Sequence, residues 1–330
     1  MNPLPVGCTL HDNKKIELMK KYILVFIILG LLICDKVLSQ QIPMYGQYIF
    51  NNTVINPAQA GARDKNQAGI LGRYQWIGID GAPVTYSGFA NFRLPNNIGL
   101  AVGLFQDELG PIRDFTLQTD LAYHARLTEK WYLSGGLRLF LSSLNINLTG
   151  LENLDPGDPY FSHDLSSGVH LNLGAGLLAF SESSFIGVAM PQAPRKGILS
   201  TNQRLNSFSR HFIAYGGTTF SLTDELVITP STLFKTSDHA PSQLDINAIL
   251  GYNDIFDFGP MVRSNLTEGW FDAIGFLVGF HITENWYFGY MYEYPVNNLN
   301  IITKQTHEIS LRYLWGSKKK IRIRSPRYFL

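Results

Sequence analysis

The sequence has little charge, almost no cysteine and no apolar stretch beyond one short run near its N-terminus. Charged residues make up 16% of the 330 positions, whereas soluble domains usually carry about 25%. A helical membrane protein would show several apolar stretches of about 20 residues, so this class is excluded. The net charge of +1 does not indicate a nucleic-acid partner. Cys8 and Cys34 both fall in a segment that we expect to be removed, so we expect neither disulfides nor thiol catalysis in the mature chain.

The N-terminus has the pattern of an export signal. It has a basic start, Met19-Lys20-Lys21, an apolar core at 22–33 and residues suited to cleavage at 37–39, which would leave Gln40 first. We predict that translation starts at Met19 and that residues 1–39 are an upstream extension plus a signal peptide. Cys34 suggests a lipoprotein, but no small residue stands just before it, as lipidation would require.

The most informative pattern is an alternation of polar and apolar residues in stretches of about 10 residues. In the clearest one, Phe115 to Leu127, the odd-numbered positions share one face and the even-numbered positions share the other. We predict strands near 67–76, 84–94, 98–106, 115–127, 131–143, 168–180, 185–191, 208–221, 226–235, 242–252, 257–264, 271–282, 286–294 and 304–315. Soluble strands commonly have about 5–6 residues and transmembrane strands about 9–11. The lengths therefore favour membrane-spanning strands.

Short turns and longer connections fall at opposite ends of these strands. The short turns are at 95–97, 128–130, 181–184, 222–225, 253–256 and 283–285, whereas the longer connections are at 144–167 and 192–207. This asymmetry is typical of transmembrane β-barrels, with short periplasmic turns and longer external loops. We therefore predict an all-β fold, a transmembrane antiparallel β-barrel of about 14 strands over residues 67–315. An even strand number places both termini on one side, which is the periplasm for an exported chain of the cell outer membrane.

Aromatic and charged residues add detail to this barrel. Aromatic residues cluster at predicted strand ends and suggest an interfacial girdle, although aromatics are also simply frequent in strands: Trp76, Trp131, Tyr132, Trp270, Trp286, Tyr287, Tyr313 and Trp315. The predicted inward face carries charges of both signs: Arg93, Asp120, Arg126, Arg138, Lys235, Asp245, Glu293, Glu308 and Arg312. Such a set can cross-link a lumen, whereas a diffusion porin more often has a charged constriction built from inserted loops. Both interpretations stay open, and we favour a narrow or filled lumen.

Two segments are predicted to lie outside the strands of the barrel, and the sequence leaves open whether the first of them plugs the lumen. Residues 40–66 have the composition of turns and loop rather than strand. Residues 316–330 form a basic periplasmic tail that carries Lys318, Lys319, Lys320, Arg322, Arg324 and Arg327. A solvated, disordered extension is the simpler interpretation of this tail. The functional one is a docking segment for a periplasmic or inner-leaflet partner with an acidic surface.

The usual enzymatic constellations are missing from the sequence. Residues 174–179 match a loose dinucleotide fingerprint, but they lie inside a strand pattern rather than at a strand-to-helix turn. His163 and Asp164 have no third metal ligand at a useful spacing. His124 and Asp120 share one strand face and are better interpreted as a hydrogen-bonded pair in the lumen than as a catalytic dyad. We therefore expect no enzymatic activity, no cofactor and no metal.

A series of short motifs occurs along the chain in a specific order. The motifs are Gln47-Tyr48, Asn56-Pro57-Ala58, Ala60-Gly61, residues 73–78, residues 81–85, Asp107, Gly110-Pro111, Tyr123-His124, Pro230-Ser231, Lys235, residues 243–247, Tyr252-Asn253-Asp254, Gly289-Tyr290, Tyr292 and residues 307–311. In these motifs the chain resembles the PorP/SprF family of outer-membrane proteins of the type IX secretion and gliding machinery of Bacteroidetes, over roughly residues 45–315. The resemblance marks these positions: Asn56, Pro57, Gly61, Arg73, Gln75, Trp76, Gly81, Pro83, Asp245, Asn253, Asp254, His307 and Glu308. The chain departs from the family pattern at residues 255–259, which lack a tryptophan, at Glu293 and at residues 304–306.

The resemblance implies a non-enzymatic role in protein secretion. Members resembling PorP are thought to anchor the periplasmic ring of the machine, and those resembling SprF serve the export or surface attachment of adhesins. We expect contact with outer-membrane lipid and with periplasmic type IX ring proteins or a secreted adhesin C-terminal domain, but with no nucleic acid and no small-molecule substrate. Loops 144–167 and 192–207 are candidates for cargo contact, and residues 318–327 for periplasmic contact. The alternatives are a porin or small-molecule transport channel and, more remotely, an outer-membrane lipase or acyltransferase.

Overall fold

A computed structural model describes residues 45–151, 163–193, 210–238, 240–266, 271–301, 303 and 305–316. The predicted signal peptide, the basic tail from Lys318 onward and Trp270 lie outside these residues, as do parts of both proposed cargo loops. In the described part of the chain, no helix is both long and apolar enough to cross a membrane.

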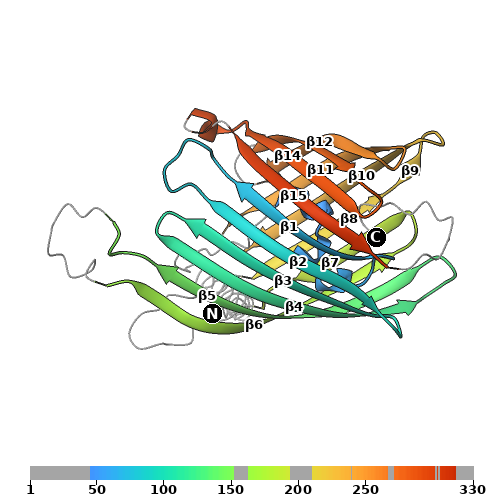
Figure 1. The fold of residues 1–330 in the computed structure, drawn as a ribbon, viewed down its shortest axis with the longest axis horizontal. Helices are drawn as coiled ribbons and strands as arrows, with labels where there is room; N and C mark the ends of the chain where they lie inside the picture. The colour runs from blue at the N-terminus through green and yellow to red at the C-terminus, as the bar shows by residue number, and fades with distance from the viewer. Residues whose placement is uncertain are drawn as a thin grey trace, which may run out of the picture. The chain divides into compact units, whose positions relative to one another are not determined.

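The described strands form one antiparallel sheet that closes on itself (Figure 1). Their bounds are Asn66–Tyr74 (β1), Val84–Leu94 (β2), Ile98–Leu109 (β3), Ile112–Arg126 (β4), Tyr132–Ile146 (β5), Leu165–Phe180 (β6), Ser184–Met190 (β7), His211–Thr218 (β8), Phe220–Ser221 (β9), Leu226–Ser237 (β10), Ala240–Tyr252 (β11), Phe256–Asn265 (β12), Ala273–His281 (β13), Trp286–Pro295 (β14) and Thr306–Trp315 (β15). Strands β8 and β9 both pair with β10 and are separated only by Thr219, so together they make one position in the wall. The 15 labelled elements therefore amount to a barrel of 14 strands, closed by pairing of β15 with β1, and the predicted fold is confirmed.

The wall alternates in the sense expected of a membrane barrel. On β4, Gln118, Asp120 and His124 are buried, whereas Leu121 and Tyr123 between them are more than half exposed. The apolar residues therefore face outward, where lipid replaces water, and the polar residues face the lumen. Closure satisfies the backbone of every paired strand, which is a requirement for backbone that crosses hydrocarbon.

Three of the short turns share one local structure. The hydroxyl oxygens of Thr128, Thr223 and Thr283 each accept hydrogen bonds from the backbone N–H groups two and three residues further on, at 3.0–3.3 Å. The side chain thus stabilises the turn in place of additional backbone bonds. A fourth turn, at Asn253 and Asp254, has φ values of 50° and 57°, which these two residue types tolerate better than others. Two of the positions marked by the family resemblance therefore shape a turn.

The opposite end of the barrel carries the longer connections. They join β1 to β2 (residues 75–83), β5 to β6 (147–164), β7 to β8 (191–210), β12 to β13 (266–272) and β14 to β15 (296–305). We call this the loop end and the other the turn end. Two connections at the loop end are nevertheless short, since β3 is joined to β4 by Gly110 and Pro111, and β10 to β11 by residues 238–239.

The predicted aromatic girdle is confirmed only in part. At the turn end, Trp286 packs on Tyr313 and Tyr313 packs on Trp315, with ring centroids 4.9 and 5.8 Å apart. Tyr132 and Tyr287 are exceptions, because both pack into the core of the lumen, and the prediction is wrong for them. Trp76 lies in the connection between β1 and β2 rather than at a strand end.

Candidate functional site

The lumen contains the N-terminal part of the described chain. Every residue from Tyr45 to Arg63 is buried, and we call this stretch the lumen segment. It forms three short 3-10 turns, η1 (Gly46–Ile49), η2 (Asn52–Val54) and η3 (Pro57–Gln59), which lie inside the wall of strands (Figure 1). The prediction of turns rather than strand holds for these residues, and the structure places them inside the barrel, which the sequence leaves open.

Asn56 and Pro57 begin the turn η3 and attach it to the wall. The Asn56 side-chain oxygen accepts a hydrogen bond from the Ala58 N–H at 2.8 Å, and proline follows at the first position, where its missing N–H costs nothing. The amide nitrogen of Asn56 donates to the Leu177 carbonyl at 3.0 Å and to the Tyr215 hydroxyl at 3.1 Å. One side chain therefore caps a turn and connects it to β6 and β8.

Further hydrogen bonds reach the lumen segment from other sides of the barrel. The Ser134 hydroxyl on β5 donates to the Ala58 carbonyl at 2.7 Å, and the Gly61 N–H donates to the side-chain oxygen of Asn91 on β2 at 2.6 Å. The Asn247 amide on β11 donates to the Tyr48 hydroxyl at 2.6 Å. Burial raises the pKa of Tyr48 well above its usual value.

Inward-facing glycines allow the lumen segment to approach the wall closely. A Cβ atom on Gly136 would lie 2.3 Å from the Ala58 nitrogen, and one on Gly99 would lie 1.8 Å from the Ala60 oxygen. Both distances are far inside van der Waals contact, so only glycine fits at these two positions. Gly61 itself has φ of +63°, which also favours glycine.

Gly136 and its neighbour Gly135 provide a matched test of this contact. A Cβ on Gly135, on the outer face, would come no closer than 3.8 Å to Leu177. We expect Gly136→Ala to lower the free energy of unfolding by about 1–3 kcal/mol, the usual cost of overpacking, and Gly135→Ala to leave it almost unchanged. Urea unfolding in detergent micelles, followed by tryptophan fluorescence, measures both. Equal effects of the two substitutions would contradict the close contact.

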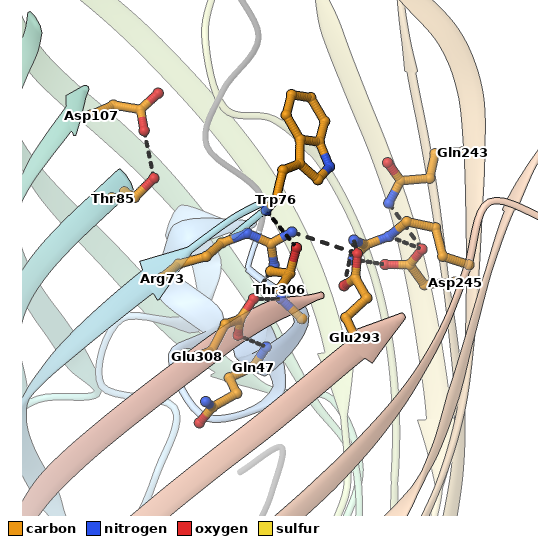
Figure 2. Close-up of polar contacts among 12 residues, drawn as sticks. Gln47, Arg73, Trp76, Thr85, Asp107, Gln243, Asp245, Glu293, Thr306 and Glu308 are labelled. Atoms are coloured by element: carbon orange, nitrogen blue, oxygen red, sulfur yellow. Dashed lines mark hydrogen bonds and ion pairs between the residues drawn. The ribbon is translucent and has the colours of Figure 1, made fainter. Parts of the chain in front are cut away.

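A buried chain of ion pairs attaches the start of the lumen segment. The Glu308 carboxylate on β15 accepts hydrogen bonds from the N–H groups of Gly46 and Gln47 at 2.6 and 2.8 Å, and it also pairs with Arg73 on β1 (Figure 2). A carboxylate that receives two backbone N–H groups and a guanidinium is well compensated for its burial. Glu308 therefore holds the segment and the wall together.

The same chain continues across the lumen. Arg73 also reaches Glu293 at 3.6 Å (Figure 2). Arg263 on β12 bridges Glu293 at 2.8 Å and Asp245 on β11 at 3.0 Å. All of these side chains are buried. Carboxylates and guanidinium groups thus alternate from β15 through β1 and β14 to β12 and β11. Charges of both signs do cross-link the lumen, as the sequence suggested.

A second ion pair holds the middle of the lumen segment. The Arg138 guanidinium on β5 bonds to the Asp120 carboxylate at 2.7 Å and donates to the carbonyls of Val54, at 3.1 Å, and Thr53. The predicted pairing of His124 with Asp120 is wrong. The His124 ring instead contacts the Ala60 carbonyl at 2.9 Å, while Asp120 is occupied by Arg138.

Arg312 on β15 holds a third part of the segment through an aromatic sandwich. Its guanidinium lies 4.4 Å from the Phe50 ring centroid and 4.2 Å from that of Tyr287. The Tyr287 hydroxyl in turn donates to Asp257 on β12 at 2.9 Å. Asp257 and Arg263 were not predicted as lumen charges. Both lie on the same face of β12 as the buried Met261, and the alternation along this strand could have identified them.

Two predicted lumen charges lie instead at the exposed turn end. Arg93 pairs with Asp64 at 2.8 Å, and Arg126 donates to the carbonyls of Thr128 and Glu129. Both have the inward strand phase but stand where the strand leaves the lumen. The strand phase alone therefore does not distinguish a buried lumen charge from one at the rim.

Four marked residues between β1 and β2 organise the loop end. The Gln75 N–H donates to the Pro83 carbonyl at 3.0 Å, and the Gly81 carbonyl accepts from Gly110 at 2.9 Å. The Trp76 N–H reaches the Thr306 hydroxyl at 3.4 Å (Figure 2). Trp76 has φ of 50° and Gly81 has φ of 71°, so both stand at sharp bends of the backbone. These residues shape the loop rather than a reactive site.

His307 and Glu308, neighbours in one motif, face opposite sides of the wall. Glu308 points into the lumen, whereas the His307 ring lies among outward tyrosines, with its Nδ1 atom 2.6 Å from the Tyr290 hydroxyl. Among the residues that the structure describes, no group of three or more His, Cys, Asp or Glu side chains is arranged to hold a metal ion. The polar residues that the structure brings together therefore attach a segment inside a barrel.

Comparison with known proteins gives one family match. The family model described as "Type IX secretion system membrane protein PorP/SprF" matches residues 37–313. No curated protein matches the chain.

Several solved structures are similar in fold. The CymD monoaromatic hydrocarbon channel matches with a TM-score of 0.51 and 11% identity over 83% of this chain and 93% of that one. A Pseudomonas aeruginosa FadL homologue matches with a TM-score of 0.48 and 10% identity over 81% and 93%. The Acinetobacter baumannii outer membrane protein Omp33 matches with a TM-score of 0.44 and 11% identity over 77% and 100%. At such low identity, the similarity to CymD concerns the barrel fold alone.

Proposed function

This chain belongs to the PorP/SprF family of type IX secretion system membrane proteins, and we propose that it is a non-enzymatic outer-membrane component of that secretion and gliding system. It acts either as an anchor for the machine or as a partner for the export or surface attachment of a secreted adhesin. The observation that carries this proposal is the filled lumen. A barrel whose interior is occupied by its own buried segment offers its two ends and its outer face to partners.

We assign the turn end to the periplasm and the loop end to the cell surface. The support is the distribution of short turns and longer connections, which matches the usual arrangement of outer-membrane barrels. In this orientation β1 starts and β15 ends at the periplasmic side, so the basic tail leaves the barrel there. Residues 1–39 are then the removed extension and signal peptide, 67–315 the barrel and 316–330 the tail.

The partner surfaces follow from this orientation. The connections at 144–167 and 192–207, which join strands at the loop end, are proposed to contact cargo. The tail carries six basic residues within 318–327 and is proposed to contact an acidic surface of a periplasmic ring protein. The described short turns between β6 and β14 carry carboxylates and no lysine or arginine, so they would not attract an acidic partner. The positive charge of the tail supplies that attraction.

An affinity pull-down tests these roles. The tagged protein is recovered from outer membranes in mild detergent, and bound proteins are identified by mass spectrometry. We expect periplasmic ring proteins in the eluate, and we expect their loss when the six basic residues of the tail are changed to glutamine, because the electrostatic attraction disappears. A variant with Glu129, Glu182 and Glu284 changed to glutamine is the control for altered charge at the same end.

The outcome separates the candidate roles. Recovery of one large surface adhesin, insensitive to the tail, would make the protein a cargo partner rather than an anchor. If neither class of protein exceeds the level found with an unrelated barrel, the secretion role is wrong and a transport channel becomes the leading alternative.

A further inference from the structure

The outer face of the barrel contains a groove that the proposed function does not use. It runs over β15, β1, β2, β3 and β4, which lie side by side in Figure 1, and has a volume of about 570 Å³. Its walls are apolar and include Ile70, Leu104, Phe115 and Ile309. These four side chains are between 46% and 62% exposed, so they line the groove without closing it.

Two glycines on neighbouring strands create the groove. Gly72 on β1 and Gly88 on β2 both belong to its lining, among much larger side chains. A Cβ atom on Gly88 would meet only a backbone oxygen at 4.0 Å, and one on Gly72 would lie 3.6 Å from the Tyr74 ring. The space above both glycines is therefore open, and a larger side chain can be placed there without displacing backbone.

The groove ends toward the loop end in a polar rim. The rings of Tyr74 and Tyr86 meet edge to face with centroids 6.0 Å apart, and their hydroxyl groups are 3.3 Å apart. His307 stands directly opposite Tyr74 on β15. Tyrosine and histidine side chains of this kind are typical of the level where hydrocarbon meets headgroups.

An arginine lies beside this rim. Arg113 on β4 is the next outward-facing residue after Phe115 in the direction of the loop end. Its Nε atom lies 3.9 Å from the Oε1 atom of Glu108 on β3, which is too far for a strong hydrogen bond. Its side chain is 65% exposed and is therefore available to a second anion. An apolar channel that leads to hydroxyl groups and a guanidinium is complementary to a phospholipid. The channel suits the acyl chain, and the polar groups at its end suit the phosphate.

We propose that this groove binds an acyl chain of a lipid in the leaflet at the loop end, with its headgroup facing the hydroxyl groups of Tyr74 and Tyr86 and, two strands along from Tyr86, the guanidinium of Arg113. The membrane position of the outer face makes lipid the nearest occupant. The rim adds the hydroxyl groups of Tyr74 and Tyr86 and, next to Glu108, the exposed guanidinium of Arg113, which a second apolar protein surface would leave unused. His307 then contributes to a lipid-facing rim, while Glu308 beside it holds the lumen segment.

Native mass spectrometry of the full mature protein tests this site. The protein is purified from outer membranes, stripped of lipid and titrated with dioleoylphosphatidylglycerol or with a digalactosyl lipid of the same tails. We expect Gly88→Leu to weaken retention of phosphatidylglycerol by about tenfold or more, as when two methylene groups leave an apolar site. Thr119→Leu, which adds similar bulk on the lipid face outside the groove, is the control and leaves retention unchanged.

A second substitution tests the rim. Arg113→Gln is expected to reduce the preference for phosphatidylglycerol over the digalactosyl lipid. The total amount of retained lipid stays the same, because the acyl chain still binds in the groove. Heat-dependent migration on gels verifies that each variant is folded, and Gly72→Ala provides a milder filling if Gly88→Leu does not fold. The proposal would be overturned if the groove variants and Thr119→Leu retained the same amount of phosphatidylglycerol. It would also be overturned if the intact protein bound a second copy of itself, and a groove substitution released that copy instead of lipid.

Discussion

Removal of the lumen segment is expected to turn a barrel that passes little current into one with a large, steady conductance. In planar bilayers, the intact protein should conduct only weakly, because Tyr45 to Arg63 are buried within the wall of strands. Deletion of residues 45–63 leaves a lumen lined by polar side chains from many strands. Water and ions can then fill it, as they fill the wider porin barrels.

A second variant guards against a deletion that does not fold. Asn56→Ala with Glu308→Gln removes two attachments of the segment, at η3 and at η1, and retains the whole chain. We expect intermittent openings from this variant. The control is Arg93→Ala, which breaks an exposed pair at the turn end. A folded deletion variant that conducts no more than the intact protein would show that something other than the lumen segment closes the barrel, and a large conductance of the intact protein would favour a transport channel.

Substitution of Arg138 by alanine is expected to produce a large loss of stability. Asp120 is fully buried, and Arg138 is its ion-pair partner as well as a donor to the carbonyls of Thr53 and Val54. Removing one partner of a buried pair leaves an uncompensated charge, which costs about 3–5 kcal/mol. The free energy of unfolding in urea, measured in detergent micelles, should fall by that amount.

Two further variants identify the origin of this loss. Changing both Asp120 and Arg138 to leucine removes the charges together and should recover part of the stability, because no charge is left buried alone. Arg93→Ala should cost less than about 1 kcal/mol, since its pair with Asp64 is exposed to solvent. If the double variant is as unstable as Arg138→Ala, the loss comes from the contacts with the lumen segment and not from the charge of Asp120.

The barrel wall could be predicted because its signals are local. Alternation within a strand depends on residues two positions apart, so the expected strand at 84–94 matches β2, Val84–Leu94. Turn residues such as Asn253 and Asp254 act on their own backbone, and they mark a turn in the sequence as they do in the structure. Strand ends were less well defined, since β6 begins at Leu165 rather than 168.

The contacts in the lumen could not be predicted in the same way. Arg73 and Glu308 are 235 residues apart and meet only because β1 pairs with β15 to close the barrel. The lumen segment has no strand pattern, and nothing in its own residues distinguishes an external loop from a buried one. Its Asn-Pro motif indicates a capped turn, but the partners of Asn56 lie on β6 and β8.

The sequence by itself determined that this chain crosses a membrane with strands, where those strands lie, and which family it resembles. The tertiary structure alone decided that the lumen is filled, that Glu308 and Arg138 hold the filling segment, and that His307 lies on the outer face of the wall. The physical reason is the range of the interactions. Alternation and turn chemistry act between near neighbours in the chain, whereas ion pairs and close packing inside a barrel depend on which strands closure brings together.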